Sequence, residues 1–209
     1  MKLAIFGASG RTGRPLVQQA LDARHTVTAL VRTPTTFPIQ HERLTVVQGD
    51  AMDPATVEKV VQGADAVLSV LGQTKNSPKD MQTVATKNII AAMQKFGITR
   101  FVSLTGAGVD APEDQPKLIN HVIKFALKTM SGAVLKDAEQ HATVLRNSDI
   151  NWTIVRGPRL TEGPHTGKYR VGWVGVNTGT RISRADIADF MLKQVSDTTY
   201  LRKAPMISD

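Results

Sequence analysis

The first residues of the chain constrain its fold more than any other stretch. A short apolar run over residues 3–6 leads into Gly7-Ala8-Ser9-Gly10-Arg11-Thr12-Gly13, and apolar residues at helical spacing follow over 16–21. This order predicts a strand, a glycine-rich turn and a helix. In such a turn the first glycine permits a tight bend, the second lets a pyrophosphate approach the backbone, and the third lets the helix lie close to the sheet. We predict a nucleotide-binding turn; the alternative is a purely structural connection.

Segments with the periodicity of strands and helices alternate along the rest of the chain. Further strands are expected over residues 26–32, 44–48, 64–72, 100–105 and 152–156. Helices are expected over residues 54–62, 80–96, 120–147 and 184–195, the third of them broken at Ser131-Gly132. This alternation predicts an α/β fold with a Rossmann-like doubly wound parallel sheet and right-handed crossovers.

The domain organisation follows from the same pattern, because no linker or internal repeat interrupts it. We expect one NAD(P)-binding domain over residues 1–209 with a small C-terminal extension on the substrate side. The substrate-side elements are expected at about 106–132 and 157–182, the second as a hairpin with loops. Two helix starts have capping residues, Asp53 before Pro54 and Ser183 three residues before Asp186.

The end of the second expected strand indicates which dinucleotide binds. NAD-selective sites place an acidic residue there for the ribose hydroxyls, whereas an Arg accommodates a 2′-phosphate. Arg32 is in that place, and no Asp or Glu follows until Glu42. Arg11, inside the glycine turn, could add a second positive charge. We therefore expect NADPH as the cofactor; the alternative for Arg32 is a surface side chain at a strand end.

The formal net charge of +8 makes nucleic acid the first partner to test. Lys and Arg are spread along the whole chain and aromatic residues make up only 5%, so neither a basic helix nor a stacking platform stands out. We expect no nucleic-acid or membrane partner, and a surface charge that attracts anionic ligands. The chain has no Cys, the histidines lack metal-site spacing, and we expect no metal site and a cytoplasmic monomer.

Several sequence blocks together resemble a known family. The opening glycine turn, residues 29–32, 65–72 and 151–158 resemble the atypical short-chain dehydrogenases/reductases, the NAD(P)-binding NmrA-like group. Within this group, Leu71-Gly72 and the turn at residues 166–169 are most similar to the biliverdin-IXβ reductase/flavin reductase family. The blocks cover nearly the whole chain. The glycine turn is common to the whole superfamily, whereas the spacing of the C-terminal motifs is more specific to the biliverdin-IXβ reductase/flavin reductase family.

The resemblance implies a set of cofactor contacts that runs along the chain. Those at the phosphates would be Gly7, Ser9, Gly10, Arg11, Thr12 and Gly13. Those at the adenosine would be Arg32 on the 2′-phosphate, with Asp50 and Ala51 on the adenine. Those near the ribose and the nicotinamide would be Leu71, Gly72, Gln73, Thr105, Gly106, Arg156, Gly157 and Pro158.

The sequence departs from the family where a proton donor would be expected. The Tyr of the Tyr-x-x-x-Lys pair is missing, because Gly132 stands four residues before Lys136. Gly106 replaces the Ser that the flavin reductases place after their fifth strand, and Arg159 replaces their His. No catalytic residue is therefore assigned; the weak candidates are Arg159, Tyr169 and Lys136. The expected substrate contacts are Arg159, Gly108, Val109 and Trp173, in a widened pocket.

The missing acid favours some reactions over others. Reduction of a simple ketone needs a positioned proton donor, which is worth on the order of 10²–10⁴-fold in rate. A flavin or a bilin accepts hydride into a conjugated system, and its proton can come later from water. We therefore expect an NADPH-dependent reductase of flavins (FMN, riboflavin) and of biliverdin IXβ-type linear tetrapyrroles. The alternative is an NmrA-like protein that senses NADP without turnover.

Overall fold

Six parallel strands form most of an eight-stranded sheet and have the order of a doubly wound fold. The computed structural model describes residues 1–74 and 76–209, without the side chains of residues 119, 121, 123–128 and 130. The central strands are β1 (Lys2–Phe6), β2 (Thr26–Val31), β3 (Leu44–Gln48), β4 (Ala66–Ser69), β5 (Arg100–Gly106) and β6 (Asn151–Gly157). Their spatial order is β3-β2-β1-β4-β5-β6, and every neighbouring pair is parallel. The predicted Rossmann-like α/β fold is confirmed.

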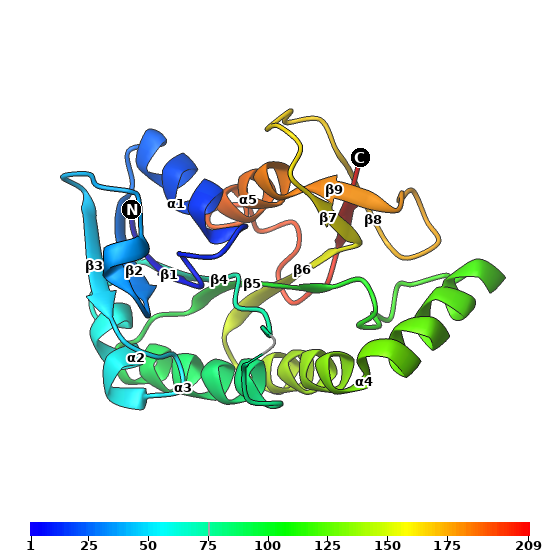
Figure 1. The fold of residues 1–209 in the computed structure, drawn as a ribbon, viewed down its shortest axis with the longest axis horizontal. Coiled ribbons are helices and arrows are strands. Elements are labelled where there is room, and N and C mark those ends of the chain that lie inside the picture. Colours follow the sequence, from blue (N-terminus) through cyan, green and yellow to red (C-terminus); the bar gives the residue numbers. More distant parts are fainter. Residues whose placement is uncertain (75) are drawn as a thin grey trace.

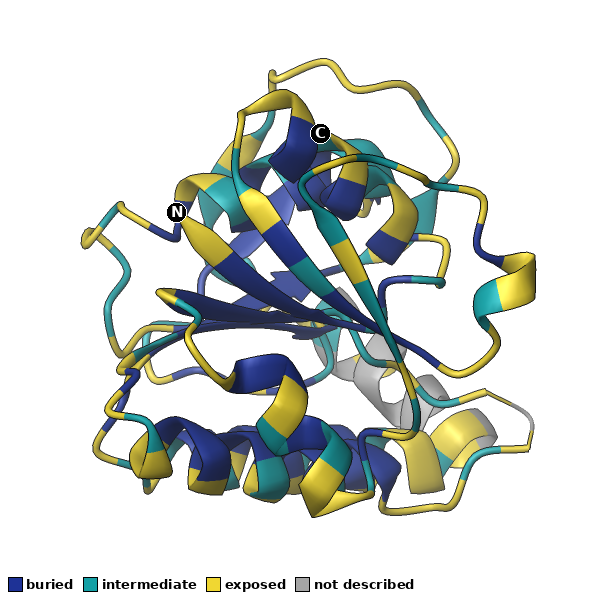
Figure 2. Cartoon of the chain, turned by 90° about the vertical axis from the view of Figure 1, so that its left-hand side faces the viewer, coloured by how far each residue is buried: buried dark blue, intermediate teal, exposed yellow. Residues whose placement is uncertain are grey.

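Helices cover both faces of this sheet (Figure 1). The helices are α1 (Gly13–Asp22), α2 (Pro54–Val61), α3 (Met81–Lys95), α4 (Leu118–Arg146) and α5 (Arg184–Lys193), with a short 3₁₀ helix η1 (Pro34–Thr36). Helices α1 and α5 contact each other on one face, while α3 lies between α2 and α4 on the other. The inner strands β1 and β4 are accordingly buried on both sides, whereas β3 at the edge of the sheet is partly exposed (Figure 2).

Strand residues alternate between two apolar cores, as the pleat of a strand requires. In β4, Val67 belongs to the core under α2, α3 and α4, whereas Ala66 and Leu68 belong to the core under α1 and α5. This explains why β4 reads as a continuous apolar run, the signature of a strand covered on both faces.

The local signals in the sequence act as predicted at three places. The Asp53 carboxylate caps α2 by accepting from the backbone N–H groups of Ala55 and Thr56, both at 3.2 Å. The Ser183 hydroxyl accepts from the Asp186 N–H at 3.0 Å and so caps α5. Helix α4 is broken at Ser131, whose φ of −142° and ψ of 36° are not helical.

The C-terminal extension differs from the hairpin expected there. Strand β7 (Arg159–Thr161) pairs with β9 (Arg181–Ser183) in parallel, so the hairpin prediction is wrong. Strand β8 (Arg170–Gly172) pairs instead with β10 (Met206–Ser208), which adds to the sheet beside β6. Each of these four strands is three residues long and pairs with a partner distant in sequence. In the part of the chain that the structure describes, no helix is long and apolar enough to cross a membrane.

Candidate functional site

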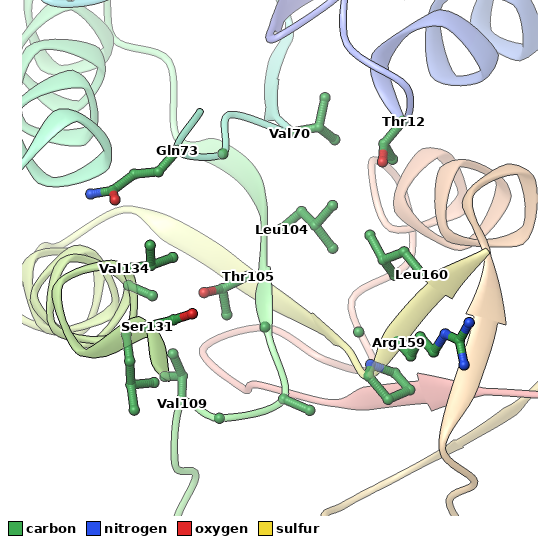
Figure 3. A pocket seen from close by; sticks show the side chains of 18 of the residues that line it. Thr12, Val70, Gln73, Leu104, Thr105, Val109, Ser131, Val134, Arg159 and Leu160 are labelled. Atoms are coloured by element: carbon green, nitrogen blue, oxygen red, sulfur yellow. The ribbon is translucent and has the colours of Figure 1, made fainter. Parts of the chain in front are cut away.

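A cavity of about 760 Å³ opens at the carboxyl ends of β1, β4, β5 and β6. Its walls come from the glycine turn at residues 10–12, from the segments 70–74 and 104–109, from α4, and from residues 157–160. Figure 3 shows side chains from these segments facing the same space. This edge of an open α/β sheet is where ligands bind, because the connections there diverge to opposite faces.

The three glycines of the turn are required for different physical reasons. Gly7 has a φ of +81°, and a Cβ there would lie 2.9 Å from the backbone carbonyl of Val70. A Cβ on Gly13 would lie 2.1 Å from the Gly7 carbonyl oxygen, so only glycine fits at either position. Gly10 is exposed and lines the cavity; the nearest atom to its Cβ would be the Gly7 oxygen, at 3.1 Å. The fold therefore depends most on Gly7 and Gly13, and Gly10 leaves room for a ligand.

The N-terminus of α1 meets the cavity at this turn. Thr12, at the N-cap position, makes no side-chain capping hydrogen bond, and the first turn of the helix holds no acidic residue. Arg14 folds back and donates from Nε to the Ser9 carbonyl at 3.1 Å, which braces the loop. A free helix N-terminus with its positive dipole end suits a pyrophosphate, so the residues present fit a dinucleotide.

Two further glycines form an open cradle on the cavity wall. A Cβ added to Gly72 or Gly106 would meet no atom within 4 Å, and both residues line the cavity. Neither has the positive φ that would itself require glycine. Their missing side chains therefore leave room beside the backbone for a flat ligand group.

The predicted adenosine contacts lie at the ends of β2 and β3, outside this cavity. Arg32 is exposed and makes no hydrogen bond or ion pair with the other described residues. Asp50 uses one carboxylate oxygen, Oδ1, to accept from the Met52 N–H at 2.8 Å. The Ala51 carbonyl accepts from Asn88 at 3.2 Å. Because β2 and β3 follow β1 in the sheet, these groups lie along the same edge as the glycine turn.

Most of the predicted site residues line one cavity. Those predicted for the cofactor are Gly10, Arg11, Thr12, Leu71, Gly72, Gln73, Thr105, Gly106, Gly157 and Pro158. Those predicted for the substrate are Gly108, Val109 and Arg159. The structure thus brings together segments from four different strand ends, as the sequence order implied.

Arg156 requires a correction, because its side chain does not reach the cavity. It is completely buried and forms two 2.7 Å hydrogen bonds with the carboxylate of Asp114. It also donates to the carbonyls of Val109, at 2.8 Å, and Ala204, at 2.6 Å. Burial acts to raise the pKa of Asp114, but the hydrogen bonds from Arg156, Ala111 and Val174 outweigh it and hold that pKa below its usual value. Arg156 therefore stabilises the cavity wall by joining β6 to Val109 and Asp114 and to Ala204.

Three other candidates also lie away from the cavity. The Tyr169 hydroxyl donates to Asp189 at 2.6 Å, and burial with this bond raises its pKa to about 12. Lys136 is exposed on α4, and the Trp173 backbone pairs with that of Val176. None of the three lines the cavity. Tyr169 and Lys136 are thus not in place to donate a proton there, nor Trp173 to contact a substrate.

Sequence reasoning missed cavity residues that come from distant segments. Ser131, Val134 and Leu135 reach it from α4, Thr180 from the C-terminal extension, and Arg184 from the start of α5. The predicted substrate-side ranges 106–132 and 157–182 contained Ser131 and Thr180 without naming them, and Val134, Leu135 and Arg184 lie outside those ranges. Among the described lining residues the cations are Arg11, Arg159 and Arg184, with no Asp, Glu, His, Tyr or Lys.

Glu162 bridges two of these cations. It lies 3.4 Å from Arg11 Nη1 and 2.7 Å from Arg184 Nη1. Arg159 makes no side-chain hydrogen bond or ion pair with the described residues, which leaves its charge available. In the described chain no three His, Asp or Glu side chains gather as a metal site would require.

Comparisons with known proteins agree with this geometry. Residues 7–198 match the family model described as NAD(P)H-binding. The chain is 26% identical to protein YwnB of Bacillus subtilis, over 93% of this chain and 92% of YwnB. Other curated relatives that it matches are longer, and the chain spans between 31% and 61% of their length.

Solved structures share the fold over the whole chain. One is a short-chain dehydrogenase/reductase from Veillonella parvula in complex with NADP, with a TM-score of 0.82, 23% identity, and coverage of 100% and 94% of the two chains. Another is ChuY of Escherichia coli O157:H7, described as an anaerobillin reductase, with a TM-score of 0.79, 20% identity, and coverage of 100% and 97%. The NAD(P)-binding family that the motifs predicted is confirmed, and these solved structures show the same fold.

Proposed function

The chain belongs to the NAD(P)H-binding family, and on that premise we propose an NADPH-dependent reductase that transfers hydride to flavins or biliverdin-type linear tetrapyrroles. The observation that carries this proposal is the cavity beside the glycine turn. It is wide and largely apolar, and its described lining residues include arginines but no acid. Such a site suits a flat, anionic acceptor that needs no proton donor from the protein.

The chain's own groups would hold NADPH by its phosphates and leave its nicotinamide facing the cavity. The turn at residues 10–12 and the α1 N-terminus would bind the pyrophosphate. Arg32 would pair with the 2′-phosphate. Gly72 and Gly106 would let the ribose and the nicotinamide lie against the backbone. When bound, NADPH supplies the hydride.

The remaining residues would orient the acceptor and exclude water from it. Val70, Leu104 and Leu160 surround the central space in Figure 3, where a flat ring would lie against the nicotinamide. Holding two reactants in contact accelerates transfer by itself. Arg159, the arginine without a carboxylate partner, would bind an FMN phosphate or a bilin propionate.

The first experiment measures NADPH consumption by the purified protein with FMN, riboflavin or biliverdin. We expect oxidation that depends on both the protein and the acceptor. A simple ketone should react far more slowly, because its alkoxide product would need a proton donor. Binding of NADPH with no consumption under any of these acceptors would contradict the reductase. It would favour the alternative, an NADP sensor, which the absence of acids among the described lining residues also supports.

The cofactor preference is tested separately by measuring the dissociation constants of NADPH and NADH. We expect NADPH to bind more tightly, by about 1.5–3 kcal/mol, through the charged hydrogen bond to Arg32. Arg32→Ala should lose this preference and keep NADH binding. Lys87→Ala, at an exposed position of α3, changes the net charge equally and serves as the control. Equal affinities in the unmutated protein would contradict the assignment.

A further inference from the structure

One buried hydroxyl in the cavity lacks a hydrogen-bond partner. Thr105 lies near the end of β5 with only 5% of its surface exposed, and its Oγ1 makes no hydrogen bond within the described structure. Native proteins rarely leave a buried polar atom unpaired, because such an atom has lost its water without a replacement. Since Thr105 lines the cavity, the partner that its hydroxyl lacks can be supplied by a ligand.

A second hydroxyl reaches the same place from α4. Ser131 lines the cavity from the non-helical residue that interrupts this helix. In Figure 3 the hydroxyls of Thr105 and Ser131 point toward one another, with Val109 and Val134 nearby. No hydrogen bond joins them: Thr105 Oγ1 is buried without a partner and Ser131 is exposed, so both can bind a third group in the cavity. Because Thr105 is buried, a hydrogen bond to its hydroxyl is stronger there than it would be in water.

We propose that Thr105 and Ser131 form a recognition pair for the edge of a cyclic amide, adjacent C=O and N–H groups on the acceptor ring. This rests on the proposed reductase function and narrows its substrate class. A hydroxyl both donates and accepts, so two adjacent hydroxyls match an edge that offers an acceptor and a donor. The imide edge of a flavin and the terminal lactam of a bilin have this pattern, whereas a quinone offers carbonyls alone.

The charges in the cavity are consistent with this orientation. Arg159 lies on the opposite side of Leu104 from Thr105 and Ser131 in Figure 3. The amide edge would therefore lie toward α4, and an anionic substituent would lie toward β7. The pair determines specificity and donates no proton to the reacting atom.

The experiment compares riboflavin with riboflavin methylated on the ring N3, which removes the donor of the amide edge. The unmutated protein should have a KM for riboflavin roughly fivefold below that for the methylated form. Thr105→Val, which keeps the side-chain shape, should raise the riboflavin KM by a similar factor and abolish the discrimination. Ser131→Ala should act in the same direction. The proposal moves Thr105 from the predicted cofactor contacts to the acceptor, so the dissociation constant of NADPH should stay the same in both variants.

The control is Thr45→Val, because Thr45 is exposed on β3 and does not line the cavity. It should change neither the KM nor the discrimination. Unchanged kinetics in Thr105→Val would overturn the proposal and leave the reductase function intact. Weaker NADPH binding with an unchanged acceptor KM would also overturn it, because Thr105 would then serve the cofactor.

A failure of the reductase function itself gives a different result. If neither flavin supports NADPH oxidation, riboflavin binding to the NADP⁺-loaded protein is measured by quenching of riboflavin fluorescence. Weaker binding in Thr105→Val than in the unmutated protein would support the recognition pair even then. Equal binding, or no binding of riboflavin at all, would overturn it.

Discussion

The cavity wall differs between the two halves of the sheet, the half from β3 to β4 and the half that begins at β5. From β1 to β4 the ligand-facing surface is mainly backbone, exposed by Gly10 and Gly72 and by the uncapped start of α1. After β5 the wall is fastened by side chains, above all by the buried pair of Arg156 and Asp114. A binding surface made of backbone tolerates substitution of the side chains around it. A wall held in place by one ion pair depends on both residues of that pair.

The strongest test of this comparison removes one charge from the second half. Asp114→Asn leaves the completely buried Arg156 guanidinium without a counter-charge. Breaking a buried pair in this way costs about 3–5 kcal/mol. We expect a loss of that size in the free energy of unfolding, measured with urea, and a raised KM for the acceptor where the folded protein can be assayed.

The matched control is Glu58→Gln in the first half. Its partner Lys95 lies 2.6 Å away, but both side chains are exposed by more than a third. Exposed pairs contribute about 0–1 kcal/mol, so little change is expected. A similar small loss in Asp114→Asn would show that the wall does not depend on the buried pair.

A difference between local and long-range contacts explains which features the sequence could predict. The strand, glycine turn and helix at the start of the chain and the caps at Asp53 and Ser183 follow from neighbours within a few residues, and the parallel sheet follows from the alternation of strands and helices; all were predicted correctly. The roles of Arg156 and Ser131 depend on contacts between distant segments. Arg156 ends a strand beside a predicted site, and only the position of Asp114, 42 residues earlier, shows that it points away.

A buried histidine joins the two halves and makes their contact sensitive to pH. The His141 ring on α4 bonds to Thr86 on α3 at 2.7 Å and to Ser103 on β5 at 3.2 Å. Burial lowers its pKa from 6.5 to about 4; Asp137 opposes this shift and Arg146 adds to it. The folded protein therefore keeps His141 neutral at a pH where the unfolded chain is already protonated.

The expected outcome is a loss of stability as the pH falls through this window. Between about 6.5 and 4 the unfolded state binds a proton that the folded state excludes. The contribution of His141 to the free energy of unfolding should fall by about 3 kcal/mol across this range and level off below it. His141→Gln should remove this part of the pH dependence, whereas His165→Gln, at an exposed site, should not. Parallel pH profiles for the unmutated protein and His141→Gln would contradict the assignment.

The backbone site of the first half is tested at Gly10. A Val side chain there enters the path expected for the pyrophosphate. We expect Gly10→Val to weaken NADPH binding about 100-fold, or roughly 2.7 kcal/mol, with little change in the melting temperature of the free protein. The contrast is Gly13→Ala, whose Cβ would lie 2.1 Å from the Gly7 oxygen and should destabilise the fold itself. A normal NADPH-induced rise in the melting temperature of Gly10→Val would show that the turn is structural only.

The smallest expected effect concerns Arg159, the one cavity side chain of the second half that would act by its charge alone. It is exposed, so its bond to an anionic acceptor is weakened by water, and we expect about 1 kcal/mol from it. Arg159→Ala should raise the KM for FMN roughly fivefold, more than for uncharged riboflavin, and leave the affinity for NADPH unchanged.

Added salt should narrow the difference in the KM for FMN between the unmutated protein and Arg159→Ala, because exposed charges are screened. The control is Arg181→Ala on neighbouring β9, where Arg181 pairs with Asp209 at 2.9 Å and does not line the cavity. An equal change for FMN and riboflavin would mean that Arg159 shapes the cavity without binding the anion.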